Sequence, residues 1–245
     1  MALEIVPAGG SFLRPGGREG SWNIKPGSRA ADDFVVSPFA FVAADASEAV
    51  SALQELRQSR PDATPLLFGS PHDAGILFER HTAPPTSAAE WLARAHTFDI
   101  DQWLAQRRED FEADQDPDEP SPSRGDWPGV ATPMTELHVS KDLLKAGSKA
   151  TCIIGLLPTP DPTEVAAYLS FGGWNDCPDP QVHICLARRW RDRHGAVQVS
   201  NTYDSIEFRV AKPISERKEA LERWANHVAG AKNTRTSSSS LMSKN

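Results

Sequence analysis

At residues 168–183 the chain reads YLSFGGWNDCPDPQVH. Glycines, aromatic side chains, a thiol and an imidazole are more concentrated in this stretch than anywhere else in the sequence. A helical pattern over 162–169 precedes the pair Gly172-Gly173, which breaks the chain, and Pro178 or Pro180 can start the next helix. We therefore expect a short helix, a tight turn and a longer second helix.

Strand-like segments flank this helical stretch on both sides. Residues 150–157, ATCIIGLL, form an apolar run with little alternation, which predicts a strand buried on both faces. Residues 196–200 and 205–210 are two further strand-like runs. Because the intervening residues 201–204 read NTYD, a composition typical of turns, we expect these two strands to form a hairpin.

The N-terminal half also alternates strand and helix patterns. An apolar run at 34–42 indicates a strand, a helical pattern follows between residues 45 and 61, and 64–69 indicates a second strand. This order of strand, helix and strand predicts a parallel pair. Further on, Ser87 and Glu90 form a capping box that predicts the start of another helix.

The fold class that these patterns predict is α/β, or α+β, with a mixed sheet and flanking helices. An acidic segment rich in proline and glycine separates two regions, and a serine-rich tail follows a last predicted helix at 215–228. The expected division is an irregular lead-in at 1–33, an N-terminal α/β region at 34–112, an acidic linker or loop at 113–129, a C-terminal α/β domain at 130–229 and a disordered tail at 230–245.

The net charge of the 245-residue chain is −7, and it comes from one place. Seven acidic residues lie between Arg108 and Arg124 with no basic residue among them. The rest of the chain has 26 acidic and 26 basic residues. Nucleic-acid-binding proteins normally carry a basic excess. The charge distribution therefore gives no reason to expect nucleic acid as a partner.

Composition indicates a cytoplasmic protein. The sequence has no long apolar run, and its first residues lack the basic and apolar segments of a secretory signal, so we expect no membrane partner. Cys152, Cys177 and Cys185 are an odd number of cysteines, which argues against a disulfide framework and suits a reducing compartment. Oligomeric state is not indicated by the sequence.

Cys177 and His183 are the first candidates for chemistry. Cys177 precedes the expected helix, where the helix dipole lowers the pKa of a thiol. His183 lies six residues later, more than one helical turn away, so proton transfer would require the chain before Pro178 to fold back. The spacing favours structural roles for both residues. It also matches no zinc motif, and we expect no metal and no cofactor.

Other candidates lie beside this pair and on the hairpin. Four residues of the turn could form the floor of a binding site, or a structural turn with the indole as a core plug; they are Gly172, Gly173, Trp174 and Asn175. Asp204 and Glu207 form a carboxylate pair of the kind used in acid–base chemistry, although hairpin turns favour Asp for local reasons.

A group of arginines lies near the C-terminal end of the longer helix. Such a cluster could bind phosphate or an acidic protein partner, whereas cations at a helix C-terminus also complement the helix dipole on an exposed face. The residues are Arg188, Arg189, Arg191 and Arg193. The third hypothesis, a nucleic-acid-binding regulator, depends on this arginine cluster alone.

The combination of motifs resembles a bacterial family common in actinomycetes, the uncharacterised domain-of-unknown-function family 4253. The resemblance covers about residues 150–225 and implies a cytosolic α/β domain with no established activity, so no catalytic residue is carried over. The motifs are Tyr168-Leu169, Gly172-Gly173-Trp174-Asn175, Cys177-Pro178, His183, Arg188 to Trp190, Gly195-Ala196, and Asp204 with Glu207 and Val210.

The end of the chain departs from the pattern of that family. Where its members continue with a segment resembling E-H/Q-Y-A-Y-C-P-D and a further helix, this chain reads WANH at 224–227, followed by a serine-rich tail. We therefore expect the likeness to stop near residue 225. The sequence-based hypothesis is that the tail arises from a shifted reading frame or a truncation.

Two functions follow as hypotheses. The first is a non-enzymatic cytosolic binding or regulatory protein, with the acidic loop and the arginine cluster as contact surfaces for a protein partner. The alternative is an enzyme, a hydrolase or transferase, that uses Cys177 or His183 with Asp204 or Glu207. The enzyme requires tertiary contacts that spacing alone does not show.

Overall fold

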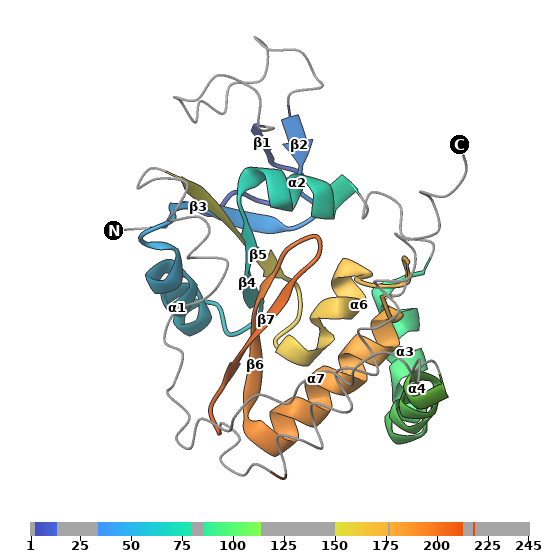
Figure 1. The fold of residues 1–245 in the computed structure, drawn as a ribbon. Coiled ribbons are helices and arrows are strands. Elements are labelled where there is room, and N and C mark those ends of the chain that lie inside the picture. Colours follow the sequence, from blue (N-terminus) through green and yellow to red (C-terminus); the bar gives the residue numbers. More distant parts are fainter. Residues whose placement is uncertain are drawn as a thin grey trace, which may run out of the picture.

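A mixed five-stranded sheet forms the centre of the computed structural model, which describes residues 3–13, 34–79, 86–113, 150–175, 177–212 and 218 (Figure 1). The strand order is β3-β5-β4-β6-β7, and only the β4–β6 pair is parallel. The strands are β3 (Ala40–Asp45), β4 (Thr64–Gly69), β5 (Thr151–Leu157), β6 (Ala196–Asn201) and β7 (Ile206–Val210). The sheet and its flanking helices confirm the predicted fold class.

Strands from both halves of the chain alternate in this sheet. β3 and β4 run in the same direction, but β5 lies between them and is antiparallel to both. The prediction that the first two strands pair with each other is therefore wrong, because a strand from the other side of the acidic segment lies between them. The division at 113–129 does not separate two sheets.

Helices cover both faces of the sheet. On one face, α1 (Ala49–Ser59) packs against the strands through Ala49, Leu53 and Leu56. On the other face lie α2 (Pro71–Glu79), α3 (Ala88–Thr97), α6 (Val165–Leu169) and α7 (Pro180–His194), with α4 (Ile100–Ala113) outside them. Figure 1 shows α1 on one side of the sheet and α3, α4, α6 and α7 together on the other.

The inner strand β5 is buried on both faces, as its apolar run predicts. Ile153 and Leu157 lie in the core shared with α2, α3, α6 and α7, whereas Cys152 and Ile154 lie in the core shared with α1. Gly155 leaves room for the ring of Phe68 in β4, since a Cβ on Gly155 would lie 1.8 Å from Cε2 of that ring. The Phe68 ring therefore occupies the space that a side chain at position 155 would fill.

Several predicted elements are confirmed with small changes. The predicted strand at 34–42 is divided around Pro38 into β2 (Phe34–Val36) and β3, and β2 pairs with β1 (Ser11–Leu13) in a separate two-stranded sheet. The predicted short helix at 162–169 consists of a 3₁₀ turn, η2 (Pro162–Glu164), followed by α6. The hairpin is formed by β6 and β7.

Other predictions lie wholly or largely outside the described residues. They are most of the lead-in at 1–33 and of the acidic segment at 113–129, the last helix at 215–228 apart from Lys218, and the tail at 230–245. Within the described part, no helix combines the length and the apolar character that crossing a membrane requires.

Candidate functional site

The turn between α6 and α7 has an unusual backbone. Ser170, the C-cap of α6, and Asn175 both adopt positive φ angles, of 42° and 49°, although neither is glycine. Gly172 and Gly173 have φ angles of 116° and 78°. Backbone strain of this kind costs about 1 to 3 kcal/mol for each non-glycine residue and persists only where the surroundings fix the conformation. The surroundings of this turn therefore hold its backbone in one conformation.

Hydrogen bonds close this turn onto the segment before α7. The N–H of Gly173 points to the backbone carbonyls of Cys177 and Pro178, each at 3.1 Å. The N–H of Cys177 in turn donates to the carbonyl of Trp174 at 3.0 Å. These bonds fold the residues ahead of α7 back toward the first turn of that helix.

This fold-back brings together the thiol of Cys177 and the imidazole of His183. Their Sγ and Nε2 atoms lie 3.5 Å apart, within hydrogen-bond distance for sulfur. The expectation that helical geometry keeps the two residues apart is therefore wrong. Cys177 is not part of the helix, which begins at Pro180, and the strained turn returns its side chain to the helix surface.

The surroundings of His183 keep its ring neutral. Burial lowers the pKa of the imidazole from its ordinary value of 6.5 to about 4, while a hydrogen bond to the Pro178 carbonyl and the Asp179 carboxylate act in the opposite direction. The ring of Phe171 packs edge-on against the imidazole, with the two centroids 5.3 Å apart. At neutral pH the imidazole is therefore uncharged, and a neutral ring nitrogen can accept a hydrogen bond from the neighbouring thiol.

The other two cysteines are in different environments. Cys152 and Cys185 are buried, whereas Cys177 is partly exposed, and none of the three forms a disulfide. Burial raises the pKa of the Cys152 thiol to about 12 and also raises the pKa of Cys185. Of the three thiols, Cys177 is therefore the one placed for chemistry.

The four predicted turn residues all lie at this site. A Cβ on Gly172 would stand 1.9 Å from the Pro178 carbonyl oxygen and 3.1 Å from Cδ2 of His183. Trp174 is half-buried and packs edge-on against Phe171 at 4.9 Å, so it is neither a fully buried core plug nor a fully exposed platform. Asn175 is exposed at the outer end of the turn.

The predicted carboxylate pair lies on the β6–β7 hairpin. Asp204 accepts hydrogen bonds from the hydroxyls of Thr202 and Ser205 at 3.0 and 3.1 Å, which is the local turn role that the composition suggested. Glu207 lies on β7 in register with Ser200. The contacts that the structure shows for Asp204 belong to the turn itself.

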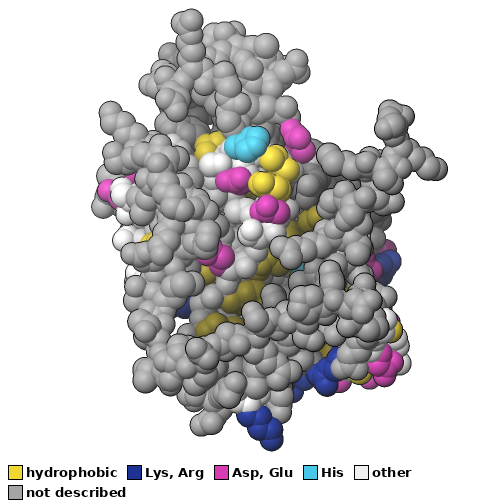
Figure 2. All heavy atoms as spheres, in the orientation of Figure 1, with side chains coloured by type: hydrophobic (Ala, Val, Ile, Leu, Met, Phe, Trp, Pro, Cys, Tyr) yellow, Lys and Arg dark blue, Asp and Glu magenta, His cyan; other side chains and the backbone are white. Residues whose placement is uncertain are grey.

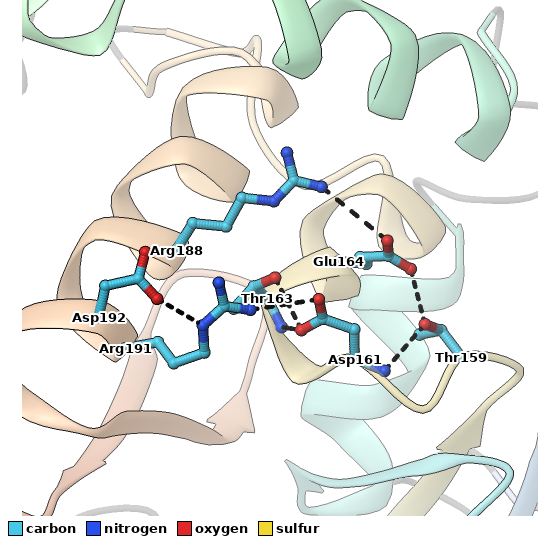
Figure 3. Close-up of polar contacts among 7 residues, drawn as sticks. All are labelled: Thr159, Asp161, Thr163, Glu164, Arg188, Arg191 and Asp192. Carbon is cyan, nitrogen blue, oxygen red and sulfur yellow. Dashed lines mark hydrogen bonds and ion pairs between the residues drawn. The ribbon is translucent and has the colours of Figure 1, made fainter.

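Three of the four predicted arginines form ion pairs inside the molecule. Arg188 faces Glu164 at 3.9 Å, Arg189 pairs with Asp101 on α4, and Arg191 contacts Asp161 at 3.3 Å as well as its neighbour Asp192. Figure 3 shows Arg188 and Arg191 reaching from α7 toward the segment that holds Asp161 and Glu164. Arg193 is exposed.

The described surface agrees with this pairing. Figure 2 shows Lys and Arg side chains near the lower right of the molecule, and Asp and Glu side chains lie close to them on the same face. In the described part of this face, the basic side chains therefore do not form a separate basic patch. Among the described residues, no three His, Cys, Asp or Glu side chains are grouped to hold a metal ion.

Two site residues were not singled out from the sequence. Phe171 is 3% exposed and supports the His183 ring, and Asp179 acts on the imidazole through its charge. Asp179 stands directly before Pro180, the first residue of α7, which is a recognisable helix-start signal. Phe171 could have been noted as the apolar residue before the glycine pair.

Comparison with known proteins bears on the C-terminal part of the chain. The model of the family described as domain of unknown function (DUF4253) matches residues 153–241. The match extends beyond residue 225, where the likeness was expected to stop, so that expected end is wrong. No curated protein and no solved structure matches the chain. The region that holds Cys177 and His183 thus matches the model of the DUF4253 family, the family that its motifs resemble.

Proposed function

We propose that this protein is an enzyme, a hydrolase or transferase, in which Cys177 is the nucleophile and His183 is the base. The observation that supports the proposal is the 3.5 Å distance between Sγ of Cys177 and Nε2 of His183. A thiol is activated by an adjacent base within hydrogen-bond reach, and the base is in turn oriented by a third group. Here the Pro178 carbonyl hydrogen bonds to the imidazole and would supply that orientation.

The proposed reaction proceeds through a thioester. The thiol proton passes to Nε2 of His183 while Sγ attacks the carbonyl carbon of an acyl substrate. The bond to the leaving group then breaks, and that group takes the proton from the imidazolium. Water or a second acceptor attacks the thioester, transfers a proton to His183, and releases the acyl product together with the Cys177 thiol.

The environment of His183 sets the timing of the proton transfer. Because burial lowers its pKa to about 4, the ring does not hold a proton at neutral pH before substrate binds. Negative charge that develops on Sγ during the attack favours the protonated ring, because Nε2 lies 3.5 Å from the sulfur. The proton therefore moves as the bond from sulfur to carbon forms rather than beforehand.

Acyl-enzyme formation tests this proposal. The full chain is incubated with a panel of acyl thioesters and activated esters, and intact-mass and peptide mass spectrometry measure acylation of Cys177. We expect acylation at Cys177 with release of more than one equivalent of product. Cys177→Ser should abolish both, and His183→Ala should slow acylation by about 10²- to 10⁴-fold, the usual range for a general base.

The matched control for the histidine is His96→Ala. His96 is exposed on α3, and its replacement should leave the acylation rate unchanged. If acylation of Cys177 is no faster in the native chain than in the chain unfolded with denaturant, the proposal fails. An equal rate for His183→Ala and the native protein would exclude His183 as the base.

The binding role that the sequence favoured has less support from the described contacts. It relied on the acidic segment at 113–129, which lies largely outside the described residues, and on arginines of which three form internal ion pairs. The reducing compartment is retained in the proposal, because a nucleophilic thiol must stay reduced and the three cysteines form no disulfide.

A further inference from the structure

The Asp179 side chain does not form the capping hydrogen bond that its position predicts. Asp179 is the N-cap of α7, where an aspartate side chain normally accepts a hydrogen bond from the backbone N–H of the second or third helical residue. Here it makes no such bond. Its Oδ2 accepts a hydrogen bond from Nε2 of Gln181 at 3.3 Å, and its Oδ1 lies 3.0 Å from the position that a Cβ on Gly173 would take.

This placement directs a negative charge toward the turn that carries the thiol. Gly173 bonds to the backbone of Cys177, and the Asp179 carboxylate also acts on the His183 imidazole through its charge. Asp179 is exposed, so its carboxylate can meet a ligand as well as the protein. A substrate that approaches Cys177 therefore enters the field of a carboxylate.

An aromatic side chain stands on the same turn. Trp174 follows Gly173 and is half-buried, with its ring edge-on against Phe171. The positive φ angles of Gly173 and Asn175, on either side of the tryptophan, fix the path of the backbone there. The turn and the helix start therefore supply two groups that attract cations, an indole through its ring quadrupole and a carboxylate through its charge.

We propose that the Cys177 site selects substrates that carry a positive charge near the reacting group, with Asp179 as the specificity-determining residue and Trp174 as the aromatic contact. The substrate class is an acyl compound with an ammonium or similar cationic group. This inference rests on the proposed function, because it assigns a substrate class to the same thiol. Asp179 would attract the cation of the substrate and repel an anionic analogue.

Three methanethiosulfonate reagents of different charge test the selectivity. Their side groups are trimethylammonioethyl, sulfonatoethyl and methyl. In each reaction the Cys177 sulfur, having lost its proton to the base or solvent, attacks the sulfenyl sulfur. A disulfide forms, and methanesulfinate leaves with the bonding electron pair. Second-order rates at Cys177 are measured on the full chain by mass spectrometry, and N-acetylcysteinamide, a thiol without a charged group, gives the intrinsic rates of the reagents.

We expect the cation-to-anion rate ratio at Cys177 to exceed the ratio for N-acetylcysteinamide about tenfold at low salt, the size of effect that one nearby carboxylate exerts. Salt should reduce this excess. Asp179→Asn should bring the ratio to that of N-acetylcysteinamide, and Asp179→Glu should keep most of the preference. The matched control is Asp192→Asn, because Asp192 is an exposed carboxylate at the other end of α7. That variant should leave the ratio unchanged.

The results separate this inference from the proposed function. The selectivity is overturned if the ratio equals that of N-acetylcysteinamide, if Asp179→Asn leaves it unchanged, or if Cys177 reacts with none of the reagents. The role of His183 is read from the neutral methyl reagent alone, whose rate His183→Ala should lower. A charge preference without an effect of His183 would support the inference about Asp179 and contradict the proposed base.

Discussion

Gly172 lies against the backbone carbonyl of Pro178 so closely that a Cβ would stand 1.9 Å from the oxygen. Gly172 also has a φ angle of 116°, a conformation that residues with a side chain rarely adopt. This contact fixes the turn against the segment that carries Cys177, and the same carbonyl hydrogen bonds to His183. The juxtaposition of thiol and imidazole therefore depends on a position where only glycine fits.

Replacing this glycine should separate the thiol from the imidazole. Gly172→Ala should lower the free energy of unfolding by at least about 1 to 3 kcal/mol because of backbone strain alone. It should also reduce the alkylation rate of Cys177 to that of His183→Ala. Gly9→Ala is the matched control, since Gly9 has a φ of 84° but no atom within 4 Å of an added Cβ. Equal Cys177 reactivity in the Gly172→Ala and native proteins would contradict the role of this contact.

The packing of β5 against β4 should also be sensitive to an added methyl group, at Gly155. Gly155→Ala forces Cβ into the ring of Phe68 and should cost about 1 to 3 kcal/mol of unfolding free energy, as overpacking of cores does. Adding Phe68→Leu should recover part of this loss. A double-mutant cycle from denaturant unfolding measures the coupling, and strict additivity of the two changes would show that they do not interact.

Stability should depend on pH through His183. The pKa of this imidazole is about 4 in the folded chain and near 6.5 in the unfolded chain, so the unfolded state binds more protons between these values. Stability should therefore fall as pH falls from 6.5 to 4, by an amount on the order of 3 kcal/mol. Denaturant titrations across this range should show a steeper pH dependence for the native protein than for His183→Gln. Parallel curves would contradict the depressed pKa.

The three cysteines should differ sharply in reactivity. Iodoacetamide at neutral pH should label Cys177 in the native chain, while Cys152 and Cys185 react only when the protein unfolds, because both are buried and have raised pKa values. Peptide mass spectrometry over a time course measures each site. The buried pair serves as an internal control, and labelling of Cys152 before Cys177 would be incompatible with this structure.

The ion pairs of α7 should contribute less to the free energy of unfolding than the capped turn at Asp161 that they contact. Asp161 accepts hydrogen bonds from the N–H and the hydroxyl of Thr163 at 2.9 and 2.8 Å and caps η2 (Figure 3). Asp161→Ala should therefore cost about 1 kcal/mol. Asp192→Ala removes only an exposed contact with Arg191 and should cost less than about 0.5 kcal/mol. Thermal unfolding of both variants checks the order, and equal costs would contradict it.

Much of the local structure could be predicted from short-range signals. The capping box of Ser87 and Glu90 is present, with both reciprocal hydrogen bonds formed. The longer helix begins at Pro180 and ends at His194, and its C-cap Gly195 adopts a left-handed φ of 59°. These signals are local, because proline, glycine and capping residues act on the backbone within a few positions. The helix of Pro71–Glu79 was missed, although Ser70 and Asp73 cap it by the same kind of mutual bond.

The thiol–imidazole contact could not be predicted in the same way. The separation of six residues suggests that Cys177 and His183 lie apart if one extends the helix backward, but the chain leaves the helix at Pro180. The return of Cys177 depends on φ angles at Gly172 and Asn175 and on bonds to two backbone carbonyls. Residue types permit such angles without specifying which turn they produce.

The sequence by itself determined most of the described elements of this protein and the family that its C-terminal part resembles, because both depend on residue types at fixed spacing. Only the tertiary structure decided that β5 inserts between β3 and β4 and that Cys177 meets His183. Both are contacts between segments that local signals leave independent. The position of β5 depends on the packing beside Gly155, and the contact of Cys177 with His183 depends on the path of the chain past Gly172.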